Sequence, residues 1–149
     1  EELSKEKHNI DTWVTAVRSG NPAAELAFNA GAHPILSLCT QGKLCPHQTF
    51  TSGENHDFRQ KTKKGFGKPL TPNNFPAPQG VVWHLLLPIS KGWGSGEQPR
   101  FDLDTLNHRI RQINTEGGVV TLDVPIASNG TIPPKVLRTL QELGKEISK

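Results

Sequence analysis

The chain has 149 residues, with 17 Lys and Arg against 14 Asp and Glu, and a formal net charge of +3. This length fits one ordinary domain with a core of its own, so we expect residues 1–149 to form a single domain. The charge excess is too small to indicate a nucleic-acid-binding protein, and no apolar run approaches the ~18 residues that a membrane span needs.

The first expected element is a short helix over about residues 12–18. Asp11 is a suitable N-cap, and Gly20 lies just past the end of the helix. The chain begins at Glu1 without a Met or a signal-like apolar stretch, so we expect a processed or truncated end. The helical spacing predicts a buried face formed by Trp13, Val14 and Val17.

Residues 24–29 (AELAFN) favour a short, mostly apolar strand. From residue 30 to about residue 80 the chain is rich in Gly, Pro, Asn, Thr and Lys, which predicts a long irregular loop of a kind that is usually functional. Within it, residues 48–51 (QTFT) are compatible with a minimal strand. The basic run at residues 59–64 (RQKTKK) has no interleaved aromatic residues, which favours a solvated loop over a nucleic-acid patch.

Regular structure is expected again over residues 81–89 (VVWHLLLPI), whose almost continuous apolar character is typical of a strand covered on both faces. A GWGSG loop follows at residues 92–96. The next helix is expected to begin near Asp102 or Asp104 and to end before Gly117. Its inward stripe consists of Leu106, Ile110 and Ile113.

A strand at residues 119–124 comes next, and Pro133 and Pro134 then open a last helix. The apolar stripe of this helix consists of Val136, Leu140, Leu143 and Ile147. Alternation of strands and helices indicates a parallel sheet. We therefore expect the second half of a (β/α)8 TIM-type barrel, because a complete barrel typically needs ~250 residues. The alternative is a small open sheet that is complete in itself.

Several motifs, in this order, resemble the α-L-fucosidase-like glycoside hydrolases, which are retaining enzymes built on a (β/α)8 barrel. The resemblance covers nearly the whole chain, but only the C-terminal half of such a barrel. It implies a carbohydrate partner, a fucose-like sugar, and either a missing N-terminal half or a second copy of the chain. The motifs lie at residues 19–22 (SGNP), 27–29 (AFN), 47–55 (HQTFTSGEN), 82–85 (VWHL), 92–94 (GWG), 117–125 (GGVVTLDVP) and 129–133 (NGTIP).

Retaining glycoside hydrolysis uses two carboxyl groups, one as nucleophile and one as proton donor. The resemblance implies that Glu54 is the proton donor, and the alternative is an exposed loop residue beside Lys and Arg. Asp57 is the second choice for this role. The strand that carries the nucleophile in this family would precede Glu1, so we assign the nucleophile to no residue of this chain.

Three further residues are candidates for sugar binding. His84 and Trp83 lie on opposite faces of their strand, so only one of them can face inward. His84 is suited to bond a sugar hydroxyl, or is a core histidine bonded to backbone. Trp93, between two glycines, offers a flat apolar face for a sugar ring, or packs under its loop. Asn29 either recognises a hydroxyl or serves as a turn residue.

The remaining polar residues indicate no cofactor. Two cysteines, Cys39 and Cys45, allow either a small disulfide or two free thiols, and no second Cys pair completes a zinc site. Asp123, inside a strand, is expected to bond backbone or His84. The sequence around Asn129 matches the acceptor pattern for N-glycosylation, which with a disulfide favours a secreted protein. His33, His47 and His56 are interpreted as polar loop residues, without ligand spacing.

Three functions remain open from the sequence. The first is the C-terminal portion of an α-L-fucosidase-like hydrolase, acting on an α-linked deoxy-sugar. The second is a lectin-like carbohydrate-binding module without catalysis. The third is a structural or interaction domain that pairs through an exposed sheet edge.

Overall fold

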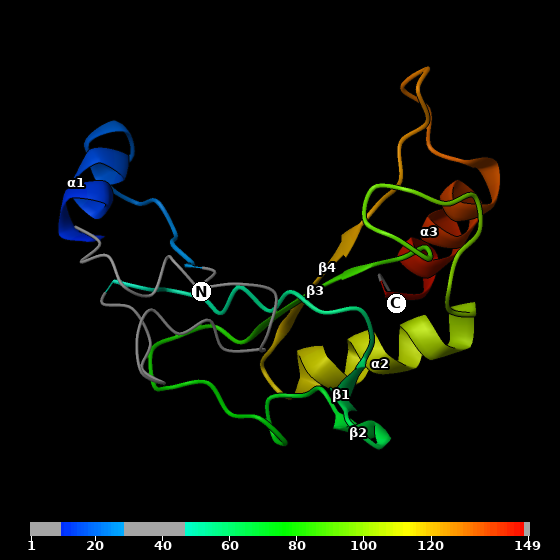
Figure 1. Ribbon diagram of the computed structural model, residues 1–149, viewed down its shortest axis with the longest axis horizontal. Coiled ribbons are helices and arrows are strands. Elements are labelled where there is room, and N and C mark those ends of the chain that lie inside the picture. Colours follow the sequence, from blue (N-terminus) through cyan, green and yellow to red (C-terminus); the bar gives the residue numbers. More distant parts are fainter. Residues whose placement is uncertain (1–9, 29–46, 148–149) are drawn as a thin grey trace.

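A computed structural model describes residues 10–28 and 47–147. These residues form three helices and two small sheets, a small mixed α/β domain (Figure 1). Among them, no helix is both long enough and apolar enough to cross a bilayer. In chain order the elements are α1 (Ile10–Gly20), β1 (Arg59–Thr62), β2 (Gly65–Pro69), β3 (His84–Pro88), α2 (Leu103–Thr115), β4 (Val119–Asp123) and α3 (Pro134–Ile147).

The centre of the domain is the parallel pair β3–β4, in a register that sets His84 opposite Val119 and Pro88 opposite Asp123. Side chains alternate along β3, so that one face packs on α2 and α3 and the other does not. On the packed face Trp83 is buried, and its indole nitrogen donates to the carbonyl of Phe75 at 2.8 Å. The strands expected at residues 81–89 and 119–124 are therefore confirmed, each with shorter bounds. The buried residues of this core are Phe58, Leu70, Trp83, Leu85, Leu87, Ile89, Leu106, Ile110, Ile113, Val136 and Leu143.

The two helices expected after residue 101 are both confirmed. Asp102 is the N-cap of α2, and its carboxylate accepts the backbone N–H of Thr105 at 2.6 Å. That hydrogen bond favours the charged form and holds the pKa of Asp102 below its ordinary value. The expected stripe of α2 is wholly buried, and in α3 Val136 and Leu143 are buried. Ile147 is an exception, because 39% of its surface is exposed at the helix end.

Residues 48–55 run beside β3 in a parallel direction, joined to it by isolated bridges at Phe50 with Val82 and at Glu54 with Leu86. Between these bridges the buried hydroxyl of Thr51, and not a backbone group, is the hydrogen-bond partner of the His84 backbone. It accepts the N–H of His84 at 2.8 Å and donates to the carbonyl of His84 at 2.9 Å. Gly53 then turns away with a positive φ of 61°. The segment therefore keeps its register with β3 without forming a continuous strand.

A hairpin of β1 and β2 lies within the region that the sequence analysis treated as irregular. The strands pair antiparallel, and Lys63 and Lys64 form the turn between Thr62 and Gly65. The base of the hairpin is anchored in the core, because Phe58 and Leu70 are buried beside it. The side chain of Phe58 meets that of Phe101 edge-on, with ring centroids 5.1 Å apart. The solvated loop expected at residues 59–64 is thus an exposed antiparallel ribbon.

The predicted half of a (β/α)8 barrel is wrong. Among the described residues only β3 and β4 form a parallel sheet, and the second sheet is an antiparallel hairpin. Residues 24–28 form no strand, although Leu26 bonds the backbone of Thr49 at 2.8 Å. The physical reason lies in the irregular segments, where side-chain hydroxyls and the turned Gly53 interrupt the backbone ladder that a barrel requires.

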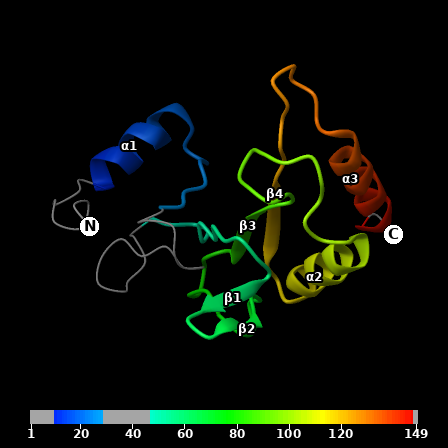
Figure 2. The same ribbon diagram turned by 45° about the vertical axis from the view of Figure 1, so that its right-hand side comes forward.

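The helix expected near residues 12–18 is confirmed as α1, but its predicted buried face is not. Val14 is 6% exposed, whereas Trp13 is 59% and Val17 is 47% exposed. Figures 1 and 2 show why: α1 lies on the opposite side of β3 and β4 from α2 and α3, apart from the other helices and strands. The helical period was therefore sufficient to locate the helix but not to identify what it packs against.

We predict that Gly53→Ala destabilises the domain by about 3 kcal/mol, through strain at positive φ and overpacking. A Cβ atom on Gly53 would lie 1.8 Å from the carbonyl oxygen of His84, a backbone atom that cannot move aside. Gly144→Ala in α3 is the control, since nothing lies within 4 Å of its added Cβ. We expect that change to raise stability by about 0.5 to 1 kcal/mol. Equal unfolding midpoints in urea for the two variants would contradict the prediction.

Candidate functional site

Three polar and aromatic residues meet where the parallel segments end. We call His56, Trp93 and Asp123 the carboxyl-edge cluster. His56 follows the segment beside β3, Trp93 lies in the loop after β3, and Asp123 is the last residue of β4. The carboxyl ends of neighbouring parallel strands lie at one edge of a sheet, so the topology brings these three chain segments together. Trp93 and Asp123 are half-buried, and His56 is exposed.

The loop that carries Trp93 is held in place by hydrogen bonds. The carboxylate of Asp123 accepts the backbone N–H of Gly94 at 2.6 Å. The hydroxyl of Ser90, which is fully buried, lies within hydrogen-bond distance of the carbonyl oxygens of Gly92 and Ser95. Because a charged acceptor makes a strong hydrogen bond, Asp123 fixes the loop to the end of β4. The backbone on both sides of Trp93 is thus held by hydrogen bonds within the protein.

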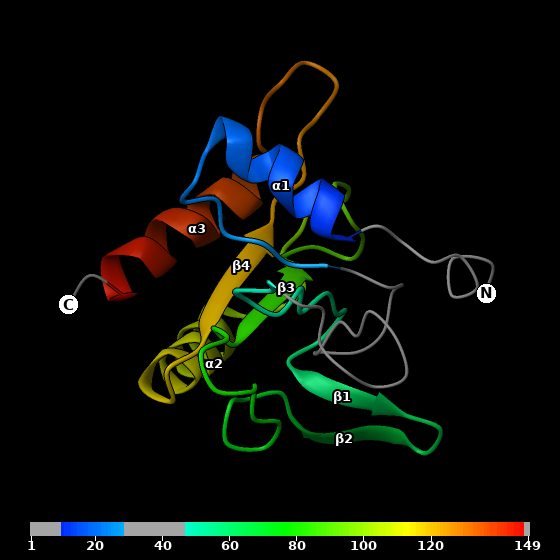
Figure 3. The same cartoon turned by 90° about the vertical axis from the view of Figure 1, so that its left-hand side faces the viewer.

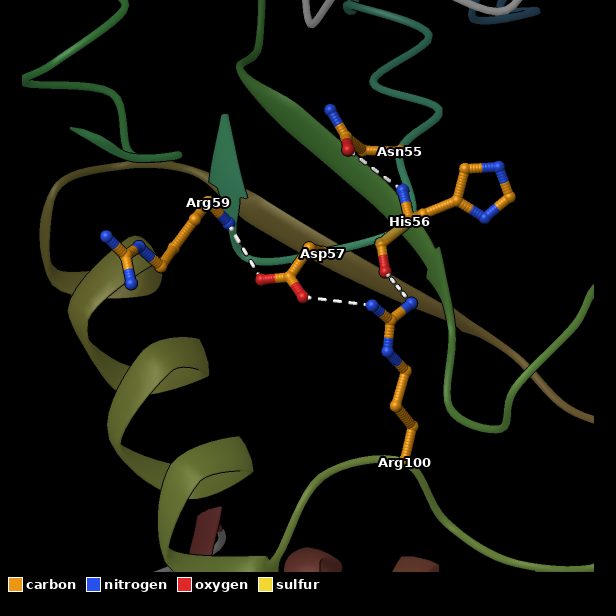
Figure 4. Close-up of polar contacts among 5 residues, drawn as sticks. All are labelled: Asn55, His56, Asp57, Arg59 and Arg100. Carbon is orange, nitrogen blue, oxygen red and sulfur yellow. Dashed lines mark hydrogen bonds and ion pairs between the residues drawn. The ribbon is translucent and has the colours of Figure 1, made fainter. Parts of the chain in front are cut away.

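His56 contacts the indole from the other side of the cluster. The two rings meet edge-on, with centroids 5.6 Å apart. Arg100 fixes the backbone beside His56, because its guanidinium donates to the carbonyl of His56 and pairs with the carboxylate of Asp57 at 3.1 Å (Figure 4). The other carboxylate oxygen of Asp57 accepts the backbone N–H of Arg59 at 3.2 Å. Asp57 therefore has a structural role, and its predicted second-choice role as an acid has no support from this geometry.

Glu54 and His84 lie on the sheet face that α2 and α3 leave uncovered. Glu54 stands opposite Leu86, which in turn stands opposite Thr121, so Glu54 and Thr121 share this face. Glu54 is half-buried and is not turned fully outward to water. Its predicted role as a proton donor stays a prediction.

Both ring nitrogens of His84 have protein partners. Nδ1 lies 3.0 Å from the carbonyl of Thr51 and therefore donates to it, while Nε2 lies 2.9 Å from the hydroxyl of Thr121. The Phe50 ring and the imidazole also form a T-shaped pair, with ring centroids 5.5 Å apart. A sugar hydroxyl would have to replace Thr121 to reach Nε2. The geometry thus fits the core-like alternative for His84 better than free hydroxyl recognition.

The other predicted site residues divide into two groups. Asn29, Cys39 and Cys45 lie outside the described residues, so their predicted roles stay predictions. Asn129 lies in an exposed turn, where its side-chain oxygen accepts the hydroxyl of Thr131 at 2.7 Å. Its glycosylation also stays a prediction.

Two members of the site were not identified from the sequence. His56 was interpreted as a loop residue, because only the fold brings it to Trp93, which is 37 positions away in the chain. Arg100 belongs to no motif recognised in the sequence, and its role depends on its contacts with residues 56 and 57 in the fold. Within residues 10–28 and 47–147, no group of three or more His, Cys, Asp or Glu is placed to hold a metal ion. A shallow, open hollow lies along α1, lined by Asp11, Thr12, Thr15, Ala16 and Ser19.

Comparisons with protein-family models, with curated proteins and with solved structures return no match to this chain. Function must therefore be inferred from the chemistry of the site. The carboxyl-edge cluster presents one indole, one imidazole and one carboxylate at a single edge, on segments fixed by Asp123 and Arg100. This combination of a flat apolar surface with hydrogen-bonding groups suits a small polar ligand that also has an apolar face.

We predict that Asp123→Ala releases the Gly94 amide and accelerates its hydrogen exchange about tenfold, the effect of losing a hydrogen bond to a charged group. Asp123→Asn retains a side-chain oxygen at the same place and should have a smaller effect. The Gly130 amide, which donates to the carbonyl of Ala127 at 2.8 Å, serves as an internal reference in the same spectra. Unchanged exchange at Gly94 in the Ala variant would show that Asp123 does not hold the loop.

Proposed function

We propose that this chain recognises a carbohydrate at the carboxyl-edge cluster. The observation that carries the proposal is the position of Trp93, whose ring contacts the His56 ring and whose neighbour Gly94 donates its N–H to the Asp123 carboxylate. Indoles bind sugars through their flat apolar surface, and carboxylates and imidazoles bond the hydroxyl groups around it.

The loop that carries Trp93 is already ordered by internal hydrogen bonds, which supports the proposal on energetic grounds. A loop that must be ordered on binding reduces affinity, because its lost freedom offsets part of the contact energy. Here Ser90 already bonds Gly92 and Ser95 of the GWGSG stretch, and Asp123 bonds Gly94 in its middle. Half-burial leaves part of the indole surface accessible while packing restricts its rotation. The resemblance to α-L-fucosidase-like proteins supports a fucose-like sugar, whose deoxy position adds an apolar methyl group.

The test is a calorimetric titration of the chain with L-fucose and with related neutral sugars. We expect Trp93→Ala to weaken binding by about tenfold or more, because the stacking surface is lost. Trp13→Ala is the matched control, since Trp13 is 59% exposed on α1 and far along the chain from the cluster. Equal affinity of the two variants would remove Trp93 from the site, and no binding by the unaltered chain would reject sugar recognition.

Hydrolysis of an α-linked deoxy-sugar is the second candidate, favoured by the half-buried Glu54 on the uncovered sheet face. The second carboxylate of a retaining mechanism would come from a partner polypeptide. Asp123 is poorly suited to attack a sugar, because one of its carboxylate oxygens accepts the Gly94 N–H.

For this second candidate, we predict that Glu54→Gln lowers hydrolysis of a fucosyl disaccharide by about 10² to 10⁴-fold, the usual contribution of a positioned acid. An aryl fucoside with an acidic phenol as leaving group needs less protonation and should be affected much less. Glu97→Gln, in the exposed loop after β3, is the control. All assays include a polypeptide that supplies the second carboxylate. If the unaltered chain binds fucose but, even with that polypeptide, turns over neither substrate, recognition alone remains.

A further inference from the structure

The positive charge of the chain is concentrated in the β1–β2 hairpin. Residues 59–69 (RQKTKKGFGKP) contain five of the 17 basic residues and none of the 14 acidic residues. The other 138 residues therefore hold 12 basic and 14 acidic residues, a formal charge of −2 against +5 for the hairpin. The small net charge of +3 thus conceals a cationic ribbon on an otherwise weakly acidic protein.

The cations of this ribbon face water. All four residues of β1 are exposed, as are Lys63, Lys64 and Lys68. Neither of the two ion pairs within the described part of the chain involves a lysine of the hairpin. Figure 3 shows the turn of the hairpin pointing away from β3 and β4. No acidic side chain therefore pairs with these lysines among the described residues.

The strand register determines how the charges are arranged. Lys61 stands opposite Phe66, and the guanidinium of Arg59 lies over the Phe66 ring at 5.6 Å, so these three side chains share one face. A bulge sets Gly67 and Lys68 of β2 opposite Gln60. Phe66 is 54% exposed in the middle of the cationic face. The ribbon therefore offers cations at its face and turn, with one aromatic ring among them.

The guanidinium of Arg59 is already occupied. Its Nε donates to the carbonyl of Gly67 at 3.2 Å, and it stacks on Phe66. Two of its five N–H donors are thus engaged by the carbonyls of Gly67 and Phe66, and the other four cations of the hairpin are lysine ammonium groups, which act as point charges. A single aromatic ring that already carries an arginine is also no platform for successive bases. The surface therefore fits an anionic polymer without bases better than a nucleic acid.

The hairpin also continues directly from the carboxyl-edge cluster. Arg59 follows His56 by three residues, so their Cα atoms are at most about 11 Å apart. The turn between them is fixed, because Asp57 bonds the N–H of Arg59 and pairs with Arg100 (Figure 4). A polymer bound at the cluster could therefore extend along the ribbon without crossing a flexible joint.

From these observations we propose that the β1–β2 hairpin binds an anionic polysaccharide, whose sulfate or carboxylate groups contact Lys61, Lys63, Lys64 and Lys68. The choice of a polysaccharide rests on the proposed sugar recognition at the carboxyl-edge cluster. The hairpin would then select chains with negative charge, and the cluster would hold a single sugar ring of such a chain.

The experiment measures binding of a size-defined heparin fragment at 0.15 M salt to the unaltered chain and to two variants. The hairpin variant changes Lys61, Lys63, Lys64 and Lys68 to Gln. The control variant changes Lys91, Lys135, Arg138 and Lys145 to Gln, and so loses the same four charges from exposed positions elsewhere. We expect the hairpin variant to bind about tenfold or more weakly, as the loss of four exposed ion pairs implies, and the control variant to bind nearly as the unaltered chain does.

Three results would overturn the proposal: no heparin binding by the unaltered chain, equal losses in the two variants, or tighter binding of a single-stranded oligonucleotide of equal charge. Thermal unfolding of both variants shows that a loss of binding is not a loss of fold. Trp93→Ala separates this proposal from the proposed function. If the proposed sugar recognition is wrong and the hairpin proposal is right, the unaltered chain binds heparin but no neutral sugar. In that case Trp93→Ala leaves the affinity for heparin unchanged, and the hairpin variant still lowers it.

Discussion

The close approach of residues 51–54 to the backbone of β3 is the constraint on which the rest of the structure depends. The Thr51 hydroxyl bonds both backbone groups of His84, and Gly53 lies so near the His84 carbonyl that no side chain fits there. This contact sets the register that puts Glu54 opposite Leu86. With a shift of one residue, Glu54 would leave the uncovered sheet face and His56 would no longer meet Trp93.

A second constraint acts at the carboxyl edge, where Arg100 connects three parts of the chain. Its backbone N–H donates to the carbonyl of Ile89 at 2.7 Å, and its guanidinium pairs with Asp57. The side chains of this pair are partly buried, with 29% and 18% of their surfaces exposed, so the pair is less screened than one fully in water. Arg100 thus ties the loop after β3 to the turn that leads into the hairpin. The backbone between the cluster and the hairpin is therefore held by hydrogen bonds.

The pattern of apolar residues was sufficient to predict a helix or strand wherever a single periodic segment forms that element. The stripe of Leu106, Ile110 and Ile113, with Asp102 as the cap, located α2 to within one or two residues. The same pattern did not predict features that depend on contacts between segments far apart in the sequence. The hairpin was missed because residues 59–69 are exposed on both faces and carry no apolar alternation, and the partner of Arg100 is 43 positions away. The half-barrel was inferred from element order, which does not show whether segments such as residues 24–28 complete a backbone ladder.

The uncovered face of β3 and β4 explains why an almost continuously apolar segment can remain beside water. Parallel strands are normally covered on both faces, and residues 81–89 fit that pattern by composition. In the fold, however, Trp83, Leu85 and Leu87 lie on the packed face, and His84 and Leu86 on the other are half-buried. His84 satisfies both of its ring nitrogens through Thr51 and Thr121, so this face carries a bonded polar network in place of a second apolar layer. Glu54 shares this face, where it stands opposite Leu86 and is half-buried.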